Sequence, residues 1–176
     1  MRLGETLDLP WLLPGAAIAF VVSLAASGAV GRALRVRRPV ACVMVLSLGI
    51  ILAATLTPQS EALAFGAVGT GSCDFSRIGL APLHELLEFN ETSLNVLLFA
   101  PLGASIAFIP RSRLKVVVII AAIALPFGIE TIQLLPVLDR ACESADVIDN
   151  LTGLAIGLAG GVVAGRLVAA MDRRPR

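Results

Sequence analysis

Glu130 is the residue of this sequence that packing explains least well. It lies within residues 116–135, a stretch that is otherwise almost wholly apolar. A carboxylate near the centre of a membrane costs roughly 2.5–3.5 kcal/mol even on lenient insertion scales. We therefore expect Glu130 to face protein or a wet cavity, where a partner offsets that cost.

Other polar residues stand at spacings that bring them to the same membrane face as Glu130. Gln133 lies three residues later, so both side chains project from one side of a helix. Arg140 follows in a short loop before the next apolar run, and Asn95 lies at the start of an earlier one. Because helices of a bundle end at common membrane surfaces, we expect one ligand-binding site. Its predicted members are Asn95, Phe99, Glu130, Gln133, Arg140, Asp146, Asp149 and Asn150.

These residue types suit the binding of an amphiphile. Carboxylates and amides exchange hydrogen bonds with sugar or phosphate groups, and Arg140 can pair with an anion. Apolar walls that include Phe99 can hold an acyl chain. The predicted ligand is therefore a membrane lipid or a lipid-linked glycan of the cell envelope.

Catalysis is the competing functional interpretation. Glu130 and Asp149 would then form an acid–base pair in an intramembrane enzyme, and Arg140 would hold the phosphate of a lipid carrier. Two carboxylates within about 10 Å of each other, with room between them, would favour such an enzyme. Carboxylates tied up in mutual hydrogen bonds would disfavour it.

Structural roles also fit several of these residues. Asp146 and Asp149 suit the acidic first turn of a helix, where the helix dipole favours negative charge. Asn95 can hydrogen-bond to a neighbouring helix, as polar residues in membrane spans often do. The structural alternative for Glu130 is an ion pair with Arg140. A helix-capping role does not explain Glu130.

The composition indicates a membrane protein, because 57% of the 176 residues are hydrophobic and only 15% are charged. We predict an all-α fold, a polytopic transmembrane helix bundle in one membrane domain, 1–176. Its five spans cover residues 11–31, 40–56, 94–109, 116–135 and 147–169, and an outside loop covers residues 59–93. The net charge of +1 gives no sign of nucleic-acid binding, and the single histidine, His84, is too little for a metal site. We expect no cofactor and no metal.

Basic residues predict the orientation of the bundle. They gather in two short loops and the tail: Arg32, Arg35, Arg37, Arg38, Arg111, Arg113, Lys115, Arg173, Arg174 and Arg176. The positive-inside rule places these segments in the cytoplasm, and so places the N-terminus outside and the C-terminus inside. The remaining loops, which are mostly acidic, would face outward.

Two cysteines fall in the predicted outside loops. Cys73 and Cys142 can form a disulfide if that side is oxidising, whereas Cys42 lies near the inner end of the second span. The alternative is two free thiols in loops that never meet. Within the longer loop, residues 82–90 fit either a short interfacial helix or an ordinary connector.

The last span carries a face of glycines at intervals of four residues: Gly153, Gly157, Gly161 and Gly165. Such a face lets another helix approach closely. The partner helix can belong to the same chain or to a second copy, so a homo-oligomer through these glycines is one expectation.

Several of these residues together resemble the motifs of VanZ-like membrane proteins. The run from Asn95 to Gly103 is similar to the N-x-x-x-F-x-P-x-G element of that family. Glu130–Gln133, Arg140 and Asp146–Gly157 resemble its E-x-x-Q, R and D-x-x-x-N-x-x-G-x-x-x-G elements, and Thr55–Pro58 resembles its T-L-x-P. The resemblance covers residues 45–165, but the long loop 59–93 and the two cysteines of the outside loops, Cys73 and Cys142, do not match the pattern.

The resemblance implies a bacterial origin and a role in the cell envelope. The family is named for a protein linked to low-level resistance to the glycopeptide antibiotic teicoplanin. It thus implies a multi-pass protein of the bacterial plasma membrane that affects glycopeptide susceptibility. It implies no defined reaction, because a shared fold does not carry function with it.

Overall fold

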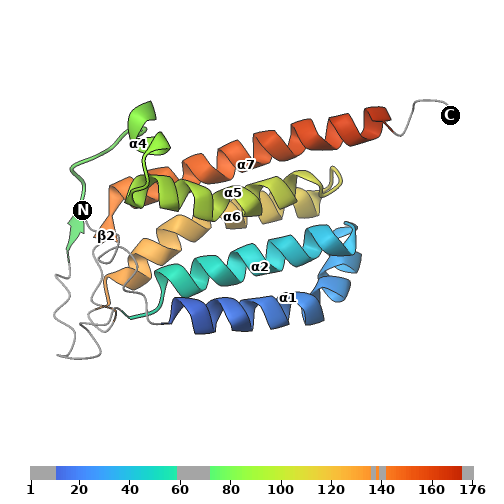
Figure 1. The fold of residues 1–176 in the computed structure, drawn as a ribbon, viewed down its shortest axis with the longest axis horizontal. Helices are drawn as coiled ribbons and strands as arrows, with labels where there is room; N and C mark the ends of the chain where they lie inside the picture. Colours follow the sequence, from blue (N-terminus) through green and yellow to red (C-terminus); the bar gives the residue numbers. More distant parts are fainter. Residues whose placement is uncertain (1–10, 59–71, 136–137, 139–141, 172–176) are drawn as a thin grey trace.

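The computed structural model describes residues 11–58, 72–135, 138 and 142–171. In these residues, long helices lie side by side in a bundle (Figure 1). The long helices are α1 (Leu12–Leu34), α2 (Arg38–Thr55), α5 (Glu91–Ala107), α6 (Arg113–Gln133) and α7 (Ser144–Met171). The short elements are β1 (Cys73–Asp74), α4 (Leu83–Leu87) and β2 (Cys142–Glu143). The predicted all-α bundle is therefore confirmed, and each predicted span corresponds to one long helix.

Local capping residues explain why some helices start earlier than hydropathy alone predicts. At α5, the side chain of Asn90 accepts a hydrogen bond from the Ser93 N–H at 2.9 Å. The Asn90 N–H donates in return to Ser93 Oγ at 3.1 Å, which completes a capping box. At α6, Ser112 Oγ accepts from the Lys115 N–H. These caps begin the helices three residues before the predicted starts of their apolar spans.

Four helices of the described chain are long and apolar enough to cross a membrane: α1, α2, α6 and α7. The fifth predicted span, α5, is apolar but has 17 residues. At 1.5 Å per residue it is roughly 26 Å long, slightly shorter than the hydrocarbon core of a typical bilayer. Large apolar side chains such as Leu13, Val117 and Leu167 are exposed on the outside of the bundle, as expected where lipid surrounds it.

The closest helix contact joins α5 to α7 through glycine. A Cβ atom at Gly153 would collide with the backbone of Val96, and one at Gly157 with the backbone of Ala100. A Cβ atom at Gly161 would come within 2.5 Å of the Ala104 carbonyl oxygen. The glycine face thus holds α5 of the same chain.

This contact concerns four glycines for which a homo-oligomer stays a prediction: Gly153, Gly157, Gly161 and Gly165. In the described chain, the first three glycines are covered by α5. A Cβ atom at Gly165 would make an ordinary contact with the Phe108 ring at 3.7 Å. The spacing correctly predicted a close approach, but it did not identify the partner helix.

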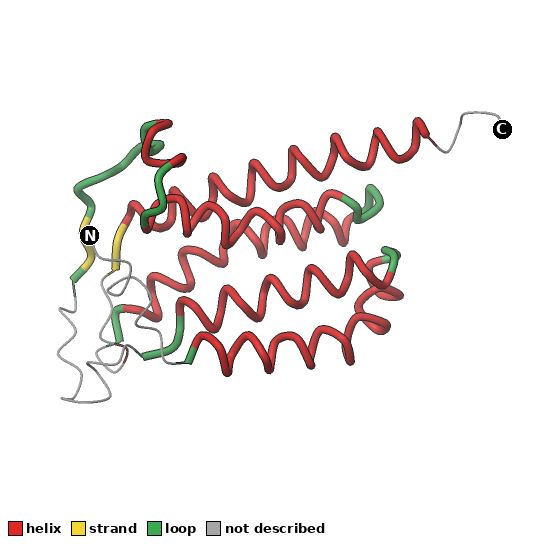
Figure 2. The backbone as a smooth tube through the Cα atoms, viewed as in Figure 1, coloured by secondary structure: helices red, strands yellow, loops and turns green. Residues whose placement is uncertain are grey.

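The two ends of the bundle differ in chemistry. At one end lie the turns between α1 and α2 and between α5 and α6, with their arginines and Lys115; we call this the basic end. At the other end lie both strands and α4 (Figure 2); we call this the disulfide end. Here α4 is shorter than the predicted helix over residues 82–90. Its Leu83 and Leu87 are exposed, by 71% and 79%.

Candidate functional site

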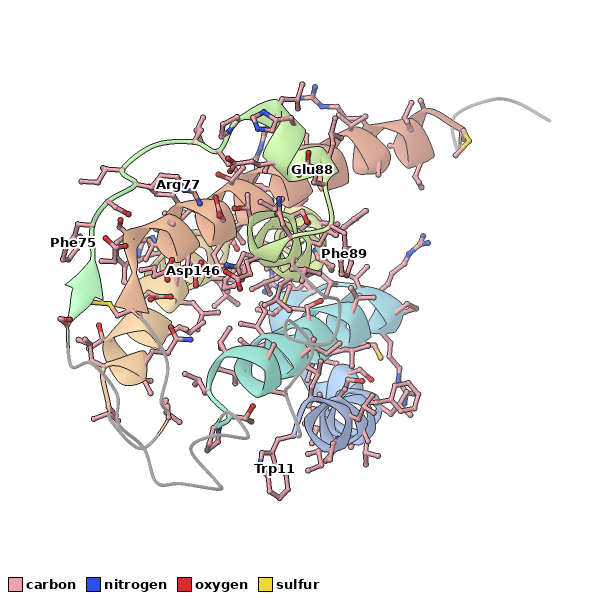
Figure 3. The ribbon with its side chains drawn as sticks, turned by 60° about the vertical axis from the view of Figure 1, so that its left-hand side comes forward. Trp11, Phe75, Arg77, Glu88, Phe89 and Asp146 are labelled. Carbon is pink, nitrogen blue, oxygen red and sulfur yellow. A yellow bond between two sulfur atoms is a disulfide. The ribbon has the colours of Figure 1, made fainter. Side chains whose placement is uncertain are left out.

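The site begins with the pairing of two short strands. Strands β1 and β2 lie parallel, with Cys73 opposite Cys142 and Asp74 opposite Glu143. Cys73 and Cys142 are joined by a disulfide bond (Figure 3). Since β2 runs directly into α7, this bond holds the segment after β1 close to the start of α7.

Arg77, four residues after Cys73, forms an ion pair with Asp149 of α7. Arg77 Nη1 donates to one oxygen of Asp149 at 3.1 Å, and Nη2 donates to the other at 2.5 Å. The side chain of Asp149 is 2% exposed, whereas that of Arg77 is 27% exposed. The ion pair therefore offsets part of the cost of burying this carboxylate. Its hydrogen bond raises the pKa of Arg77 above the ordinary arginine value, so the guanidinium stays charged.

Two further hydrogen bonds fix Arg77 in place. Ser144 Oγ, at the first residue of α7, donates to the Arg77 carbonyl oxygen at 2.8 Å. Arg77 Nη1 also donates to the Gly79 carbonyl oxygen at 3.3 Å. Figure 3 shows Arg77 reaching from the extended segment toward the first turns of α7, on the same side as Asp146. The arginine is thus held from both its backbone and its side chain.

Asp146, one turn before Asp149 in α7, connects this helix to Asn95 of α5. Asn95 Nδ2 donates to Asp146 Oδ1 at 2.7 Å. Asp146 is half-buried and lies in the first turn of α7, where negative charge is favoured. Asn95 was predicted to bond to a neighbouring helix, and Asp146 was predicted to lie at the start of a helix. The hydrogen bond between them fits both predictions.

Glu130 faces the protein and not the lipid. It is 5% exposed, and its Oε2 accepts a hydrogen bond from the backbone N–H of Glu143 in β2 at 2.8 Å. A backbone N–H is a strong donor to a charged acceptor. Glu130 thus ties α6 to the strand that carries the disulfide and leads into α7.

Gln133 and Asn150 are buried and each presents a carbonyl oxygen. Gln133, 5% exposed, donates from Nε2 to the carbonyl oxygen of Thr55 at the end of α2, at 3.0 Å. Among the described residues, neither Gln133 Oε1 nor Asn150 Oδ1 has a hydrogen-bond partner. Asn150 is 1% exposed. Such unpaired buried acceptors are uncommon and call for a donor.

We call these residues of the disulfide end the polar site: Arg77, Asn95, Glu130, Gln133, Glu143, Ser144, Asp146, Asp149 and Asn150. Of the eight residues predicted from the sequence, six belong to it. Arg140 lies outside the described residues. Phe99 is fully buried in the apolar core with Ile51, Ile106 and Ile129.

Sequence analysis missed Arg77 as a site residue. It stands in a long loop, distant in sequence from every residue that was predicted to bind the ligand. The predicted Cys73–Cys142 bond was the signal that could have found it. That bond brings the residues after Cys73 to the start of α7, where Asp146 and Asp149 lie.

An apolar cavity of about 300 Å³ lies between α5, α6 and α7, toward the middle of the bundle. Its lining includes Gly103, Ile106, Ala122, Ile123, Leu151, Leu154 and Ala155. Leu154 of the lining lies one turn after Asn150 on the same face of α7, so the cavity adjoins the polar site along that helix. The volume is at the lower end of the range for small-molecule sites. Among the described residues no cluster of histidine, cysteine or carboxylate side chains could hold a metal ion.

Comparison with known proteins gives the family of this chain. The VanZ/LLP1 family model matches residues 41–164, a range that contains the whole polar site and the cavity lining. No curated protein and no solved structure matched the chain. The matched range covers well over half of the sequence, and the apolar helices fit a membrane protein. The chain therefore belongs to the VanZ/LLP1 family.

Proposed function

We propose that this protein binds an amphiphile, either a membrane lipid or a lipid-linked envelope glycan. The head group would occupy the polar site, and an acyl chain would occupy the apolar cavity. One observation carries the proposal: Asn150, a buried amide, and Leu154, a cavity residue, lie one turn apart on the same face of α7. A polar region next to an apolar cavity is what a molecule with a head and a tail requires.

The charges of the loops support an outward-facing site. Arginines and Lys115 gather at the basic end, which the positive-inside rule assigns to the cytoplasm. The disulfide end would then lie in the oxidising compartment, where a disulfide persists. We therefore propose a multi-pass protein of the bacterial plasma membrane whose site opens to the outer leaflet.

The geometry favours binding over catalysis. Asp149 is engaged by both nitrogens of Arg77, and Glu130 accepts a hydrogen bond from the β2 backbone. A general acid or base must be within hydrogen-bond reach of its substrate, and these carboxylates already hold the helices and strands together. An intramembrane enzyme that acts on a lipid carrier remains the second candidate function.

The family resemblance suggests that teicoplanin susceptibility can be measured in cells to test this proposal. A lipid-linked glycan of the envelope belongs to the class of molecule that a glycopeptide antibiotic encounters at the cell surface. We propose that the protein alters susceptibility to teicoplanin by binding such a molecule. Deletion of the gene and its restoration would change the inhibitory concentration of teicoplanin in opposite directions.

Cavity filling tests the proposal directly. Ala155→Phe adds a ring at an exposed residue of the cavity lining, and Ala159→Phe adds the same ring one turn further along α7, at an exposed residue outside the lining. The protein would be extracted in mild detergent, and its bound lipids identified by native mass spectrometry. We expect the wild type and Ala159→Phe to carry the same lipid and Ala155→Phe to lose it. Equal lipid content in all three proteins would contradict the proposal.

A further inference from the structure

We infer that the head group recognised by the polar site is a hydrogen-bond donor, either a set of hydroxyls or an ammonium, and not a phosphate. This inference rests on the proposed binding of an amphiphile and specifies the ligand's chemistry. It follows from which hydrogen-bonding groups of the site are already paired within the chain and which are not.

Donor groups of five residues in the polar site are paired with acceptors of the same chain. Arg77 donates with two nitrogens to Asp149, and Asn95 Nδ2 donates to Asp146. Gln133 Nε2 donates to a backbone carbonyl at the end of α2. The Glu143 N–H and the Ser144 hydroxyl are paired as well, to Glu130 and to the Arg77 carbonyl. A ligand that needs donors from these groups would have to break bonds that hold the site together.

Two acceptors of the site, by contrast, remain unpaired. Gln133 Oε1 and Asn150 Oδ1 have no partner among the described residues, although each side chain is at least nine-tenths buried. Asp146 is half-buried and receives its hydrogen bond from Asn95 on one oxygen, and a carboxylate has about four acceptor positions. These residues can therefore accept further hydrogen bonds from N–H or O–H groups of a ligand.

The charges of the polar site also favour a hydrogen-bond donor over a phosphate. Glu143, Asp146 and Asp149 lie within seven residues of one another around the start of α7, and Arg77 is already paired with Asp149. A phosphate would meet carboxylates, or would have to draw Arg77 away and leave Asp149 buried without a partner. An ammonium or a sugar hydroxyl meets neither obstacle.

Probes with one alkyl chain and different head groups test this inference. Decyl glucoside and decylammonium carry donors, whereas decyltrimethylammonium is a cation without a donor and decyl phosphate is an anion. Affinities would be measured by calorimetry with the full chain in lipid nanodiscs. We expect the glucoside or the primary ammonium to bind roughly tenfold more tightly than both donor-free heads, as for one strong or two ordinary hydrogen bonds. Tighter binding of the glucoside would indicate a glycan head group, and tighter binding of the primary ammonium would indicate an amine head group.

Variants then assign the preference to the unpaired oxygens. Asn150→Leu removes an acceptor, and we expect it to lower the ratio of donor-head to phosphate affinity roughly tenfold. The matched control is Thr152→Val in the same helix, because the Thr152 hydroxyl already donates to the Ile148 carbonyl oxygen. Gln133→Met provides a second test if Asn150→Leu does not fold. The ratio of affinities is the readout because it cancels any change in the amount of folded protein.

Two outcomes separate the failure of this inference from the failure of the proposed function. If decyl phosphate binds as tightly as the donor heads, and Ala155→Phe abolishes the binding of all probes, the amphiphile site stands and the head-group inference is wrong. If Ala155→Phe leaves every probe bound, the amphiphile site itself is wrong. An unchanged affinity ratio in both Asn150→Leu and Gln133→Met would also overturn the inference.

Discussion

The middle and the disulfide end of the α5–α7 pair are held together in opposite ways. In the middle, Gly153 and Gly157 bring the two backbones into contact because side chains are missing. At the end, Asn95, Asp146 and Asp149 connect the same helices to their surroundings through charged and amide side chains. The first region fixes the distance between the helices. The second determines which groups are available to a ligand.

The difference between these regions lies in what each can tolerate. A glycine contact has no room for another atom, so its limit is steric and any larger residue exceeds it. A polar contact can accept an isosteric replacement, and its limit is the loss of a charge or of a hydrogen-bond partner. Substitutions should therefore affect stability most in the middle of the pair and function most at the disulfide end.

The largest effect is expected at the glycine contact. Gly157→Leu drives a side chain into the backbone of Ala100, which cannot rotate away, and should lower the free energy of unfolding by about 3 kcal/mol or more. Gly160→Leu is the matched control on the same helix, because a Cβ atom at Gly160 meets nothing within 4 Å. Denaturant titration in mixed micelles compares the two. Equal stabilities would show that α5 and α7 are not in backbone contact.

Removal of the disulfide should have an effect of comparable size. It links residues 69 positions apart. In the chain-entropy model a closed loop of this size stabilises the folded state by about 4 kcal/mol. Cys73→Ser combined with Cys142→Ser should approach that loss, while Cys42→Ser should have a smaller effect. Mass-tagging of thiols with and without reductant, in the membrane-resident protein, checks that the bond is present before the comparison.

Removal of Arg77 should have a moderate effect. Arg77→Met keeps most of the side-chain length but leaves the Asp149 carboxylate buried without its ion pair, which should cost about 2 kcal/mol. Addition of Asp149→Leu should recover part of that loss, because no buried charge then remains. Arg111→Met, at an exposed arginine of the basic end, is the control. Additive effects of the two substitutions would mean that the ion pair is not coupled in the membrane.

Glu130→Gln should have the smallest effect on stability and a large effect on binding. The amide oxygen of glutamine can still accept from the Glu143 N–H, so the free energy of unfolding should change by less than about 1 kcal/mol. The charge is lost, so we expect the bound amphiphile and any change in teicoplanin susceptibility to disappear. A Glu130→Gln protein that keeps its full lipid content would show that this carboxylate is purely structural.

Hydropathy and charge were sufficient to predict the bundle. The five predicted spans match α1, α2, α5, α6 and α7 because each is a continuous apolar run between charged or turn-forming segments. Helix geometry also predicted that Gly153, Gly157 and Gly161 share a face. It did not identify the helix that packs there. The spacing of glycines shows that a helix can approach closely, but it does not show which helix is the neighbour in the folded chain.

The polar site could be predicted only in part. Asn95, Glu130, Asp146 and Asp149 lie on or at the start of helices, so their heights follow from residue counts. Arg77 was missed because it lies in a loop, and the position of a loop depends on contacts that are distant in sequence. Here these are the β1–β2 pairing and the bond between Cys73 and Cys142. Phe99 was expected at the site because it lies one turn from Asn95, but it packs into the core.

The disulfide also constrains the order of events during synthesis of the chain. Cys73 precedes α5 and Cys142 follows α6, so both helices lie inside one covalent ring, and α1, α2 and α7 lie outside it. The bond can therefore form only after α6 has been made and both cysteines have reached the same side of the membrane. Under the proposed topology, a chain in which only α6 failed to insert would hold the two cysteines on opposite sides of the membrane and keep both thiols reduced. The oxidised bond would then distinguish chains in which α5 and α6 are paired from chains in which only one of them has inserted.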